Sequence, residues 1–276
     1  SDVCSSDLAL AEVAWTQPWH KNWRSFLVAM DKFNEHLSAK GIVFACSMYN
    51  IQHTVTPVNG KLQVKLECER PDVEIRYTMD GKEPTDRSLL YKSPLMVTGT
   101  QTIKCTTYRA GRQMGKTLTL PLVWNKATAK PVLGNTQAGK ILVNGIRGSL
   151  RQSDFEWHSW ESSDSVAFTI DLQKKESLRS VSVGCITNYG MAAHKPADIE
   201  VWVSNDNRDY RKVSGKQFTD GEIFREGTFK EDVVLDLNKE IGRYVRIIAK
   251  GAGECPATHV RPGQEARIYF DEVMIE

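Results

Sequence analysis

The spacing of the large apolar residues changes near residue 50, and this change limits the folds that the chain can adopt. Up to about Tyr49 these residues recur every three or four positions, as they do along one face of an α-helix. From Gln52 onward apolar and polar residues alternate in short runs separated by Gly, Pro and Asp. Such alternation is typical of half-buried β-strands joined by tight turns. The sequence therefore predicts a mainly β protein with a helical segment on its N-terminal side.

The helical segment is expected over residues 9–51. The apolar side chains that share one helical face are Trp23, Phe26, Leu27, Met30, Phe33 and Leu37. Lys40-Gly41 is a typical helix end, and the apolar run IVFACSMYNI that follows fits one buried strand. One helix and one strand cannot bury this much aromatic surface, so we expect a further domain to cover Trp15, Trp19 and Trp23.

The first eight residues do not share this pattern. Residues 1–8, SDVCSSDL, have no apolar period and join abruptly to the helical sequence. We interpret them as a non-native leader and expect the chain to be the C-terminal remainder of a longer protein.

The first β segment, residues 52–124, is predicted to be a small sandwich of immunoglobulin or fibronectin type. Its alternating runs are KLQVKLECE, EIRYTMD, PLMVTG, QTIKCTTYRA and TLTLPLVW. Asp80 and Gly81 follow EIRYTM as a strong turn pair, because Gly accepts a positive φ and Asp hydrogen-bonds its own backbone. We therefore interpret Asp80 as a turn residue rather than a ligand.

Residues 125–139 are rich in small residues and contain one proline, so we expect a linker there. Residues 140–276 are predicted to form a second antiparallel β-sandwich. Its strand-like runs are SVAFTIDL, SLRSVSVGCIT, ADIEVWVSND, DVVLDL, RYVRIIAKG and ARIYFDEVMIE. The polar, aromatic-bearing loops between these runs are where a rigid β scaffold would carry binding residues.

Composition argues against several kinds of function. The 276 residues are 41% hydrophobic, which is enough for a substantial core. The net charge is only +2, and no basic block is interleaved with aromatic residues, so nucleic acid is not an expected partner. No run approaches the roughly 18 apolar residues of a membrane span. Zinc and a disulfide framework are not expected either, because the cysteines are scattered without a CxxC pair, at Cys4, Cys46, Cys68, Cys105, Cys185 and Cys255.

Three successive segments resemble parts of one enzyme family. ALAEVAWTQPWHKNWRSFLVAMDKFNEHLSAKGIVF resembles the last helix of the catalytic barrel in glycoside hydrolase family 20, the β-N-acetylhexosaminidases. YTMDGKEPTDRSLLYKSPLMV and QTIKCTTYRAGRQMGKT resemble the small β domain that follows the barrel in chitobiase-like members. The third resemblance is to a discoidin-like domain, the coagulation-factor type C jelly-roll that is shared with family 32 carbohydrate-binding modules. The stretches that carry it are LVNGIRGS, FTIDL, SVSVGCITNYG, IEVWVSND, RYVRIIAKG and FDEVMIE.

The resemblance implies a bacterial, periplasmic or extracellular hexosaminidase that uses the acetamido group of its own substrate. The catalytic Asp-Glu pair of that family belongs to an earlier barrel strand. Here the only such dipeptide is Asp271-Glu272, in a strand-like run where alternation sends neighbouring side chains to opposite faces. The chain itself is therefore expected to be inactive, with the catalytic barrel of the same protein as a partner.

The discoidin-like segment holds the candidate sugar-binding residues. Sugar recognition needs an aromatic face for the pyranose ring and polar groups for its hydroxyls. The expected partners are glycans bearing N-acetylhexosamine or galactose-type sugars. The candidates, taken from three loops, are Trp157, His158, Trp160, Asn188, Tyr189, His194, Lys195, His259 and Arg261. Two alternatives stay open for this domain: a scaffold that binds no sugar, and a protein-binding adhesion module.

No cofactor is required, but a structural calcium ion is a further implication of the resemblance. Glu272 matches a C-terminal Glu ligand of related modules, and Asn144 stands where the family often has Asp. For residues outside these sites we expect packing or a plain surface role: Glu12 and Trp15 pack a barrel helix, His20 and His36 are solvated, and Trp202 packs in or on a sheet.

Overall fold

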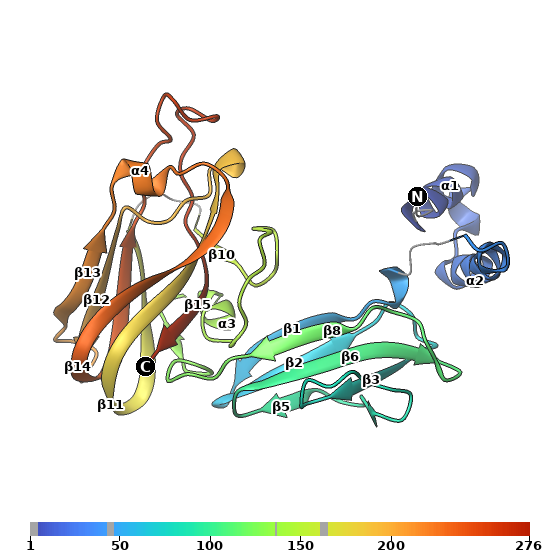
Figure 1. The fold of residues 1–276 in the computed structure, drawn as a ribbon, viewed down its shortest axis with the longest axis horizontal. Coiled ribbons are helices and arrows are strands. Elements are labelled where there is room, and N and C mark those ends of the chain that lie inside the picture. The colour runs from blue at the N-terminus through green and yellow to red at the C-terminus, as the bar shows by residue number, and fades with distance from the viewer. Residues whose placement is uncertain (1–4, 43–46, 136, 161–164) are drawn as a thin grey trace. The chain divides into compact units, whose positions relative to one another are not determined.

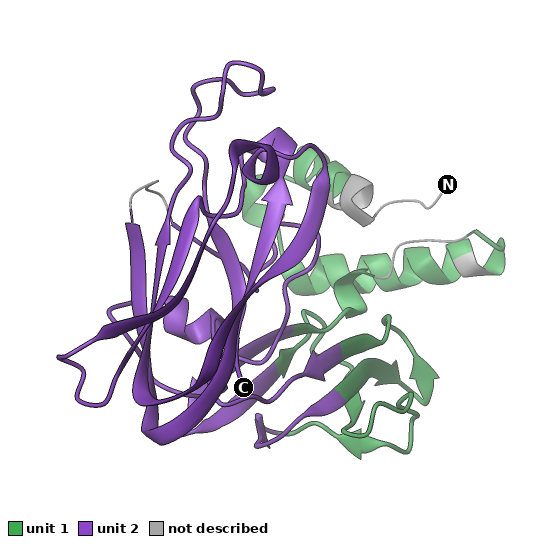
Figure 2. Cartoon of the chain, turned by 60° about the vertical axis from the view of Figure 1, so that its left-hand side comes forward, with its two compact units in different colours: residues 1–52, 66–92, 103–119 green, residues 53–65, 93–102, 120–276 purple. Residues whose placement is uncertain are grey.

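Strands form most of the regular structure, as the alternating runs predict. The computed structural model describes residues 5–42, 47–135, 137–160 and 165–276. The chain divides into two units, residues 1–52, 66–92 and 103–119, and residues 53–65, 93–102 and 120–276 (Figure 2). Cys4 and Cys46 lie outside the described residues. Among the described helices, none is long and apolar enough to cross a membrane.

The first unit begins with helices and continues into a sheet (Figure 1). The helices are α1 (Ser5–Trp15), η1 (Pro18–His20), α2 (Trp23–Ala39) and η2 (Ser47–Tyr49). The sheet has the order β4 (Leu89–Leu90), β3 (Glu74–Thr78), β6 (Gln101–Arg109) and β7 (Arg112–Gln113), and β8 (Leu118–Leu122) pairs with β6. Glu12, His20 and His36 are exposed. The expected packing of Trp15 is wrong for the described residues, because its side chain is 89% exposed.

An ion network around the buried Arg70 joins α2 to the sheet of this unit. Arg70 is only 4% exposed, and its Nη2 donates to Asp31 Oδ2 on α2 and to Asp72 Oδ2, both at 2.6 Å. Arg109, at the end of β6, donates to the same two carboxylate oxygens at 2.9 Å. The hydroxyl of Tyr49 donates to Asp31 Oδ1 at 2.8 Å. Asp31 is thus the residue through which the helix accepts hydrogen bonds from three other segments.

The second unit includes the greater part of a small sheet with the order β1 (Gln52–Val58), β2 (Lys61–Glu67) and β5 (Leu95–Val97). Alternate residues of β2 are buried, namely Leu62, Val64 and Leu66, as period two requires. In the first unit the Asp80-Gly81 turn has the predicted chemistry. Gly81 has φ +77°, and Asp80 Oδ1 accepts the Lys82 N–H at 3.2 Å.

The rest of the second unit is a seven-stranded antiparallel system with the path β10-β15-β11-β14-β12-β13, and β9 pairs with β11. The strands are β9 (Val132–Leu133), β10 (His158–Ser159), β11 (Ser165–Asn188), β12 (Asp198–Ser204), β13 (Arg211–Gln217), β14 (Thr228–Lys250) and β15 (Tyr269–Ile275). Two short helices, α3 (Ala138–Ile141) and α4 (Asp220–Ile223), lie between them. The core is aliphatic and aromatic, with Phe168, Ile170 and Phe270 at 2% exposure or less.

Two long strands replace four predicted ones. β11 joins SVAFTIDL to SLRSVSVGCIT, and β14 joins DVVLDL to RYVRIIAKG. Their pairing shifts register between Asp171 and Glu176, so the polar residues between the apolar runs form an irregularity within a strand instead of a break.

The expected linker, residues 125–139, is packed into the second unit. Ala127 is fully buried in the core, β9 within this stretch pairs with β11, and Ala138 of α3 is also fully buried. The mainly β fold class is confirmed. The domain boundaries and the barrel origin of residues 9–51 remain predictions.

Candidate functional site at one end of the second unit

Two loops meet at one end of the large sheet, and the one between β14 and β15 rises above α4 in Figure 1. The first follows β11, and Asn188 pairs there with Ala193. The second connects β14 to β15 and doubles back through the bridge between Glu254 and Glu265. A parallel bridge between Ala193 and Arg267 joins the two loops. Residues far apart in the sequence are therefore held side by side.

This junction brings together five of the predicted sugar-binding residues, namely Asn188, Tyr189, His194, His259 and Arg261. The rings of Tyr189 and His259 lie 3.9 Å apart between centroids, and those of His194 and His259 lie 5.1 Å apart. His194 is 1% exposed and His259 is 4% exposed, so neither imidazole is open to a large ligand. Burial lowers the pKa of His194 to about 4 and also lowers the pKa of His259. Both are neutral near pH 7.

The accessible groups of the junction are those of Asn188, Tyr189 and Arg261. Arg261 is exposed, and its guanidinium donates to Gly190 O at 2.5 Å and to Gln264 Oε1 at 3.1 Å. The Tyr189 hydroxyl donates to Thr258 O at 3.4 Å. Among the described residues none hydrogen-bonds the side-chain amide of Asn188. An aromatic ring, a guanidinium and a free amide at one surface form a set that can receive a pyranose ring and its hydroxyls.

A hollow of about 490 Å³ lies where β12, β13 and β14 end at the junction side of the sheet. Its lining includes Phe218, Asp198, Gln217 and Lys250. Lys195, a predicted sugar ligand, is 5% exposed, with its Nζ 3.2 Å from Glu231 Oε2 and 4.6 Å from the Phe218 ring centre. No pattern in the sequence predicts this hollow, because Phe218 is simply an aromatic residue that follows a strand-like run.

The three predicted residues of the loop DFEWHSWESSD lie elsewhere. Trp157 is 6% exposed, and its Nε1–H donates to Ser149 O at 3.0 Å. Trp160 packs on the core, 5.3 Å from Phe270 and 6.1 Å from Phe168 between ring centroids. His158 is half-buried with its ring 4.5 Å from that of Trp160. Little of this group is available to a glycan.

Trp202 has an outward position that alternation alone left uncertain. Ile199, Val201 and Val203 of β12 are buried, whereas Trp202 is half-buried and donates its Nε1–H to Glu200 Oε2 at 2.8 Å. Trp202 therefore covers the other face of the sheet.

Glu272 fits a cation site better than Asn144 does. Glu272 is fully buried, its Oε2 accepts the Gly145 N–H at 3.0 Å, and its Oε1 has no hydrogen-bond partner among the described residues. Burial raises its pKa well above the ordinary value, so a neighbouring cation would favour the ionised form. The side chain of Asn144 is already engaged, because its Oδ1 accepts the Ile146 N–H at 2.9 Å and its Nδ2 donates to Glu156 Oε2 at 2.8 Å.

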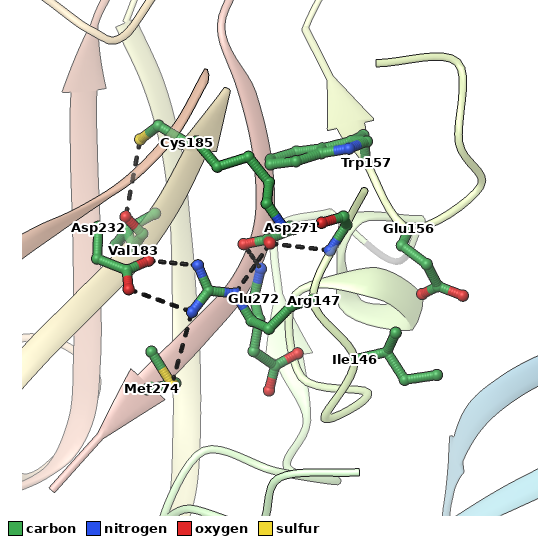
Figure 3. Close-up of polar contacts among 12 residues, drawn as sticks. Ile146, Arg147, Glu156, Trp157, Val183, Cys185, Asp232, Asp271, Glu272 and Met274 are labelled. Carbon is green, nitrogen blue, oxygen red and sulfur yellow. Dashed lines mark hydrogen bonds and ion pairs between the residues drawn. The ribbon is translucent and has the colours of Figure 1, made fainter. Parts of the chain in front are cut away.

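Asp271, the neighbour of Glu272, is bound by Arg147 (Figure 3). Asp271 is fully buried, and its Oδ2 accepts hydrogen bonds from Arg147 Nε and from the Gly148 N–H, both at 2.9 Å. Arg147 also pairs with Asp232 at the surface. A Cβ atom at Gly184 would lie 1.9 Å from Asp271 Oδ1, so only glycine leaves room for this carboxylate. Asp271 and Glu272 both lack access to solvent.

Comparison with protein families identifies both β segments. Residues 56–119 match the chitobiase/beta-hexosaminidase C-terminal domain, and residues 126–261 match the F5/8 type C domain. The chain therefore carries a chitobiase-type C-terminal domain followed by a discoidin-type domain, which confirms these two resemblances. Neither match extends to a catalytic domain.

Solved structures with a similar fold include modules of glycoside hydrolases. The CBM32-6 module of the GH89 protein from Clostridium perfringens is 17% identical, over 53% of this chain and 90% of that one, with a TM-score of 0.33. The CBM32-5 module, in complex with GalNAc-β-1,3-galactose, is 15% identical over 52% and 86%, with a TM-score of 0.34. The C-terminal domain of a chitobiase from Bacteroides fragilis is 10% identical over 48% and 76%, with a TM-score of 0.29. No curated protein matches the sequence.

Proposed function

We propose that this chain is the C-terminal, glycan-binding part of a secreted or periplasmic β-N-acetylhexosaminidase. The observation that carries the proposal is the convergence of Asn188, Tyr189 and Arg261 at the loop junction, on a domain that matches the F5/8 type C family. The Tyr189 ring would lie against the apolar face of a terminal N-acetylhexosamine or galactose-type sugar. Arg261 and Asn188 would bond its hydroxyl or acetamido oxygens.

The role of this contact would be to hold the enzyme near its substrate. A second binding site on the same chain raises the effective concentration of glycan at the catalytic domain without new contacts there. Hydrolysis itself belongs to the catalytic barrel of the parent protein. Asp271 and Glu272 would not replace its catalytic pair, because both are fully buried and Asp271 is bound to Arg147.

The test is a calorimetric titration of the 276-residue chain with N-acetylglucosamine, N-acetylgalactosamine, galactose and GalNAc-β-1,3-galactose. We expect saturable binding of at least one sugar and at least a tenfold loss in Tyr189→Ala. Phe155→Ala is the matched control, because Phe155 is an aromatic residue that is 92% exposed and lies outside the two loops. Binding that survives Tyr189→Ala and Arg261→Ala would place the glycan elsewhere, for example in the hollow beside Phe218. No binding at millimolar sugar would favour a scaffold or a protein-binding module.

The predicted lack of catalytic activity is tested separately. The chain should not hydrolyse a chromogenic N-acetylglucosaminide above the rate of buffer alone. Hydrolysis that Glu272→Gln abolishes would refute the assignment of catalysis to another domain.

A further inference from the structure

We infer that His194, Cys255 and His259 form a binding site for a zinc-type divalent cation. One ligand atom from each residue lies within 4.8 Å of the other two, and all three residues are buried. This inference goes beyond glycan binding and does not depend on it, since it concerns the buried layer beneath the accessible residues of the junction.

Both loops of the junction supply ligands. His194 is fixed by its backbone N–H, which donates to Arg267 O at 3.0 Å. Cys255 and His259 come from one short turn, CPATH, in which the His259 N–H donates to Pro256 O at 2.9 Å. The Cys255 N–H donates to Gln264 O at 2.8 Å. The backbone thus holds the three side chains in place from two directions, as a preformed metal site requires.

The spacing of the imidazole nitrogens fits tetrahedral zinc. His194 Nε2 and His259 Nε2 are 3.2 Å apart. Zinc binds nitrogen at about 2.0–2.1 Å, and tetrahedral angles then place two ligand nitrogens about 3.3 Å apart. The third ligand is a thiol, and a Cys-His-His set suits zinc rather than calcium, which prefers oxygen ligands. The three side chains leave one tetrahedral position for water.

The hydrogen bonds decide which protons must move. His194 Nδ1 lies 3.0 Å from Ile223 O, so it carries a proton and leaves the lone pair of Nε2 pointing into the site. His259 Nδ1 accepts the Arg261 N–H at 3.0 Å, so in the metal-free protein the proton is on Nε2 and is donated to His194. Burial keeps both rings neutral and raises the pKa of the Cys255 thiol.

Metal binding therefore has a defined proton balance. Cys255 loses its proton to solvent as the S–Zn bond forms. The His259 proton moves from Nε2 to Nδ1, so the hydrogen bond that the Arg261 N–H donates to Nδ1 must break when zinc binds. One zinc ion binds and one proton is released.

The experiment uses the whole chain after removal of metal with a chelator. Cobalt(II) should bind with a stoichiometry of one and give a thiolate-to-metal charge-transfer band. Zinc(II) at about a hundredfold excess over its Kd should raise the Tm by roughly 5–10 °C. It should also release one proton per ion in weakly buffered solution. Cys255→Ser should lose the band, and His259→Gln should bind cobalt at least tenfold more weakly.

Cys68→Ser is the matched control, because Cys68 is a half-buried thiol in the first unit. It should keep the band. Loss of the band in Cys68→Ser but not in Cys255→Ser would overturn the site. If Cys255→Ser does not fold, the wild-type chain still decides: an equal Tm in zinc and in chelator, without a cobalt band, overturns the inference. Sugar titrations in the presence of the chelator measure glycan binding without bound metal, so a failure of the metal site can be told apart from a failure of the proposed glycan binding.

Discussion

Arg147→Met offers the sharpest test of how the second unit is held together. The substitution keeps most of the side-chain volume and removes the cation that faces Asp271. Asp271 is fully buried, and burial raises its pKa, which the charge of Arg147 opposes. After the substitution only backbone N–H groups remain as partners, from Gly148 at 2.9 Å and from Glu272 at 2.6 Å. A buried carboxylate would be left without a counter-charge.

The expected loss in the free energy of unfolding follows from the burial of Asp271. Removing one member of a buried ion pair destabilises a protein by about 3–5 kcal/mol. Because two N–H donors still bind the Asp271 carboxylate, we expect Arg147→Met to lie near the lower end of this range, at about 3 kcal/mol. Asp232 also pairs with Arg147, but its side chain is 38% exposed, so Asp232→Asn should cost at most about 1 kcal/mol.

Urea unfolding followed by circular dichroism measures both variants. With a slope of about 3 kcal/mol per M, Arg147→Met should lower the midpoint by about 1 M, whereas Asp232→Asn should shift it by about 0.3 M or less. The double variant Arg147→Met/Asp271→Asn should recover most of the loss, since it removes the unpaired charge. Equal shifts for Arg147→Met and Asp232→Asn, or no recovery in the double variant, would refute the assignment of the cost to Asp271.

Three further predictions concern other parts of the chain. Trp160→Ala should destabilise the protein by about 3 kcal/mol in urea unfolding because its ring packs on Phe270, and a loss below about 1 kcal/mol would contradict this packing. Burial alone would raise the pKa of Asp31, but hydrogen bonds from Arg70 and two other side chains lower it below 3.8. The ionised Asp31 carboxylate therefore stabilises the protein above pH 3.8, and this stabilisation is lost as the pH falls below that value. The free energy of unfolding should decrease less steeply with falling pH in Asp31→Asn than in the wild type. Parallel pH profiles of the two proteins would argue against this. Calcium should raise the Tm of the wild type at pH 8, relative to chelator, and leave that of Glu272→Gln unchanged, because one buried oxygen of this carboxylate has no partner within the described part of the chain. An equal response in both would place the ion elsewhere.

Local sequence signals predicted the turns and most strands. Asp80-Gly81 needs only its own backbone to make a turn, and the alternation in KLQVKLECE predicts the buried face of β2 directly. The same reasoning failed for β11, where the polar residues QKKE seemed to separate two strands. A register shift between paired strands accommodates them, and a shift of that kind depends on the partner strand, β14, rather than on the local pattern.

The candidate site was less predictable because loop residues carry no period. Trp160 sits in a polar loop, yet the pairing of β10 with β15 turns its ring onto the core. Cys255 gave no signal as one of several scattered cysteines, and only the folded chain places it beside His194.

The outward face of α2 has a consequence for the behaviour of concentrated solutions. Leu27 and Met30 are buried, but Trp23 is 56% exposed and Val28 is 55% exposed, and Trp15 and Trp19 add further bare aromatic surface. A net charge of +2 supplies little long-range repulsion to keep such surfaces apart. Salt will screen that small repulsion and leave the apolar attraction intact, so self-association of this chain should increase with ionic strength. The helical segment that carries Trp15, Trp19 and Trp23 should therefore contribute to self-association out of proportion to its share of the mass.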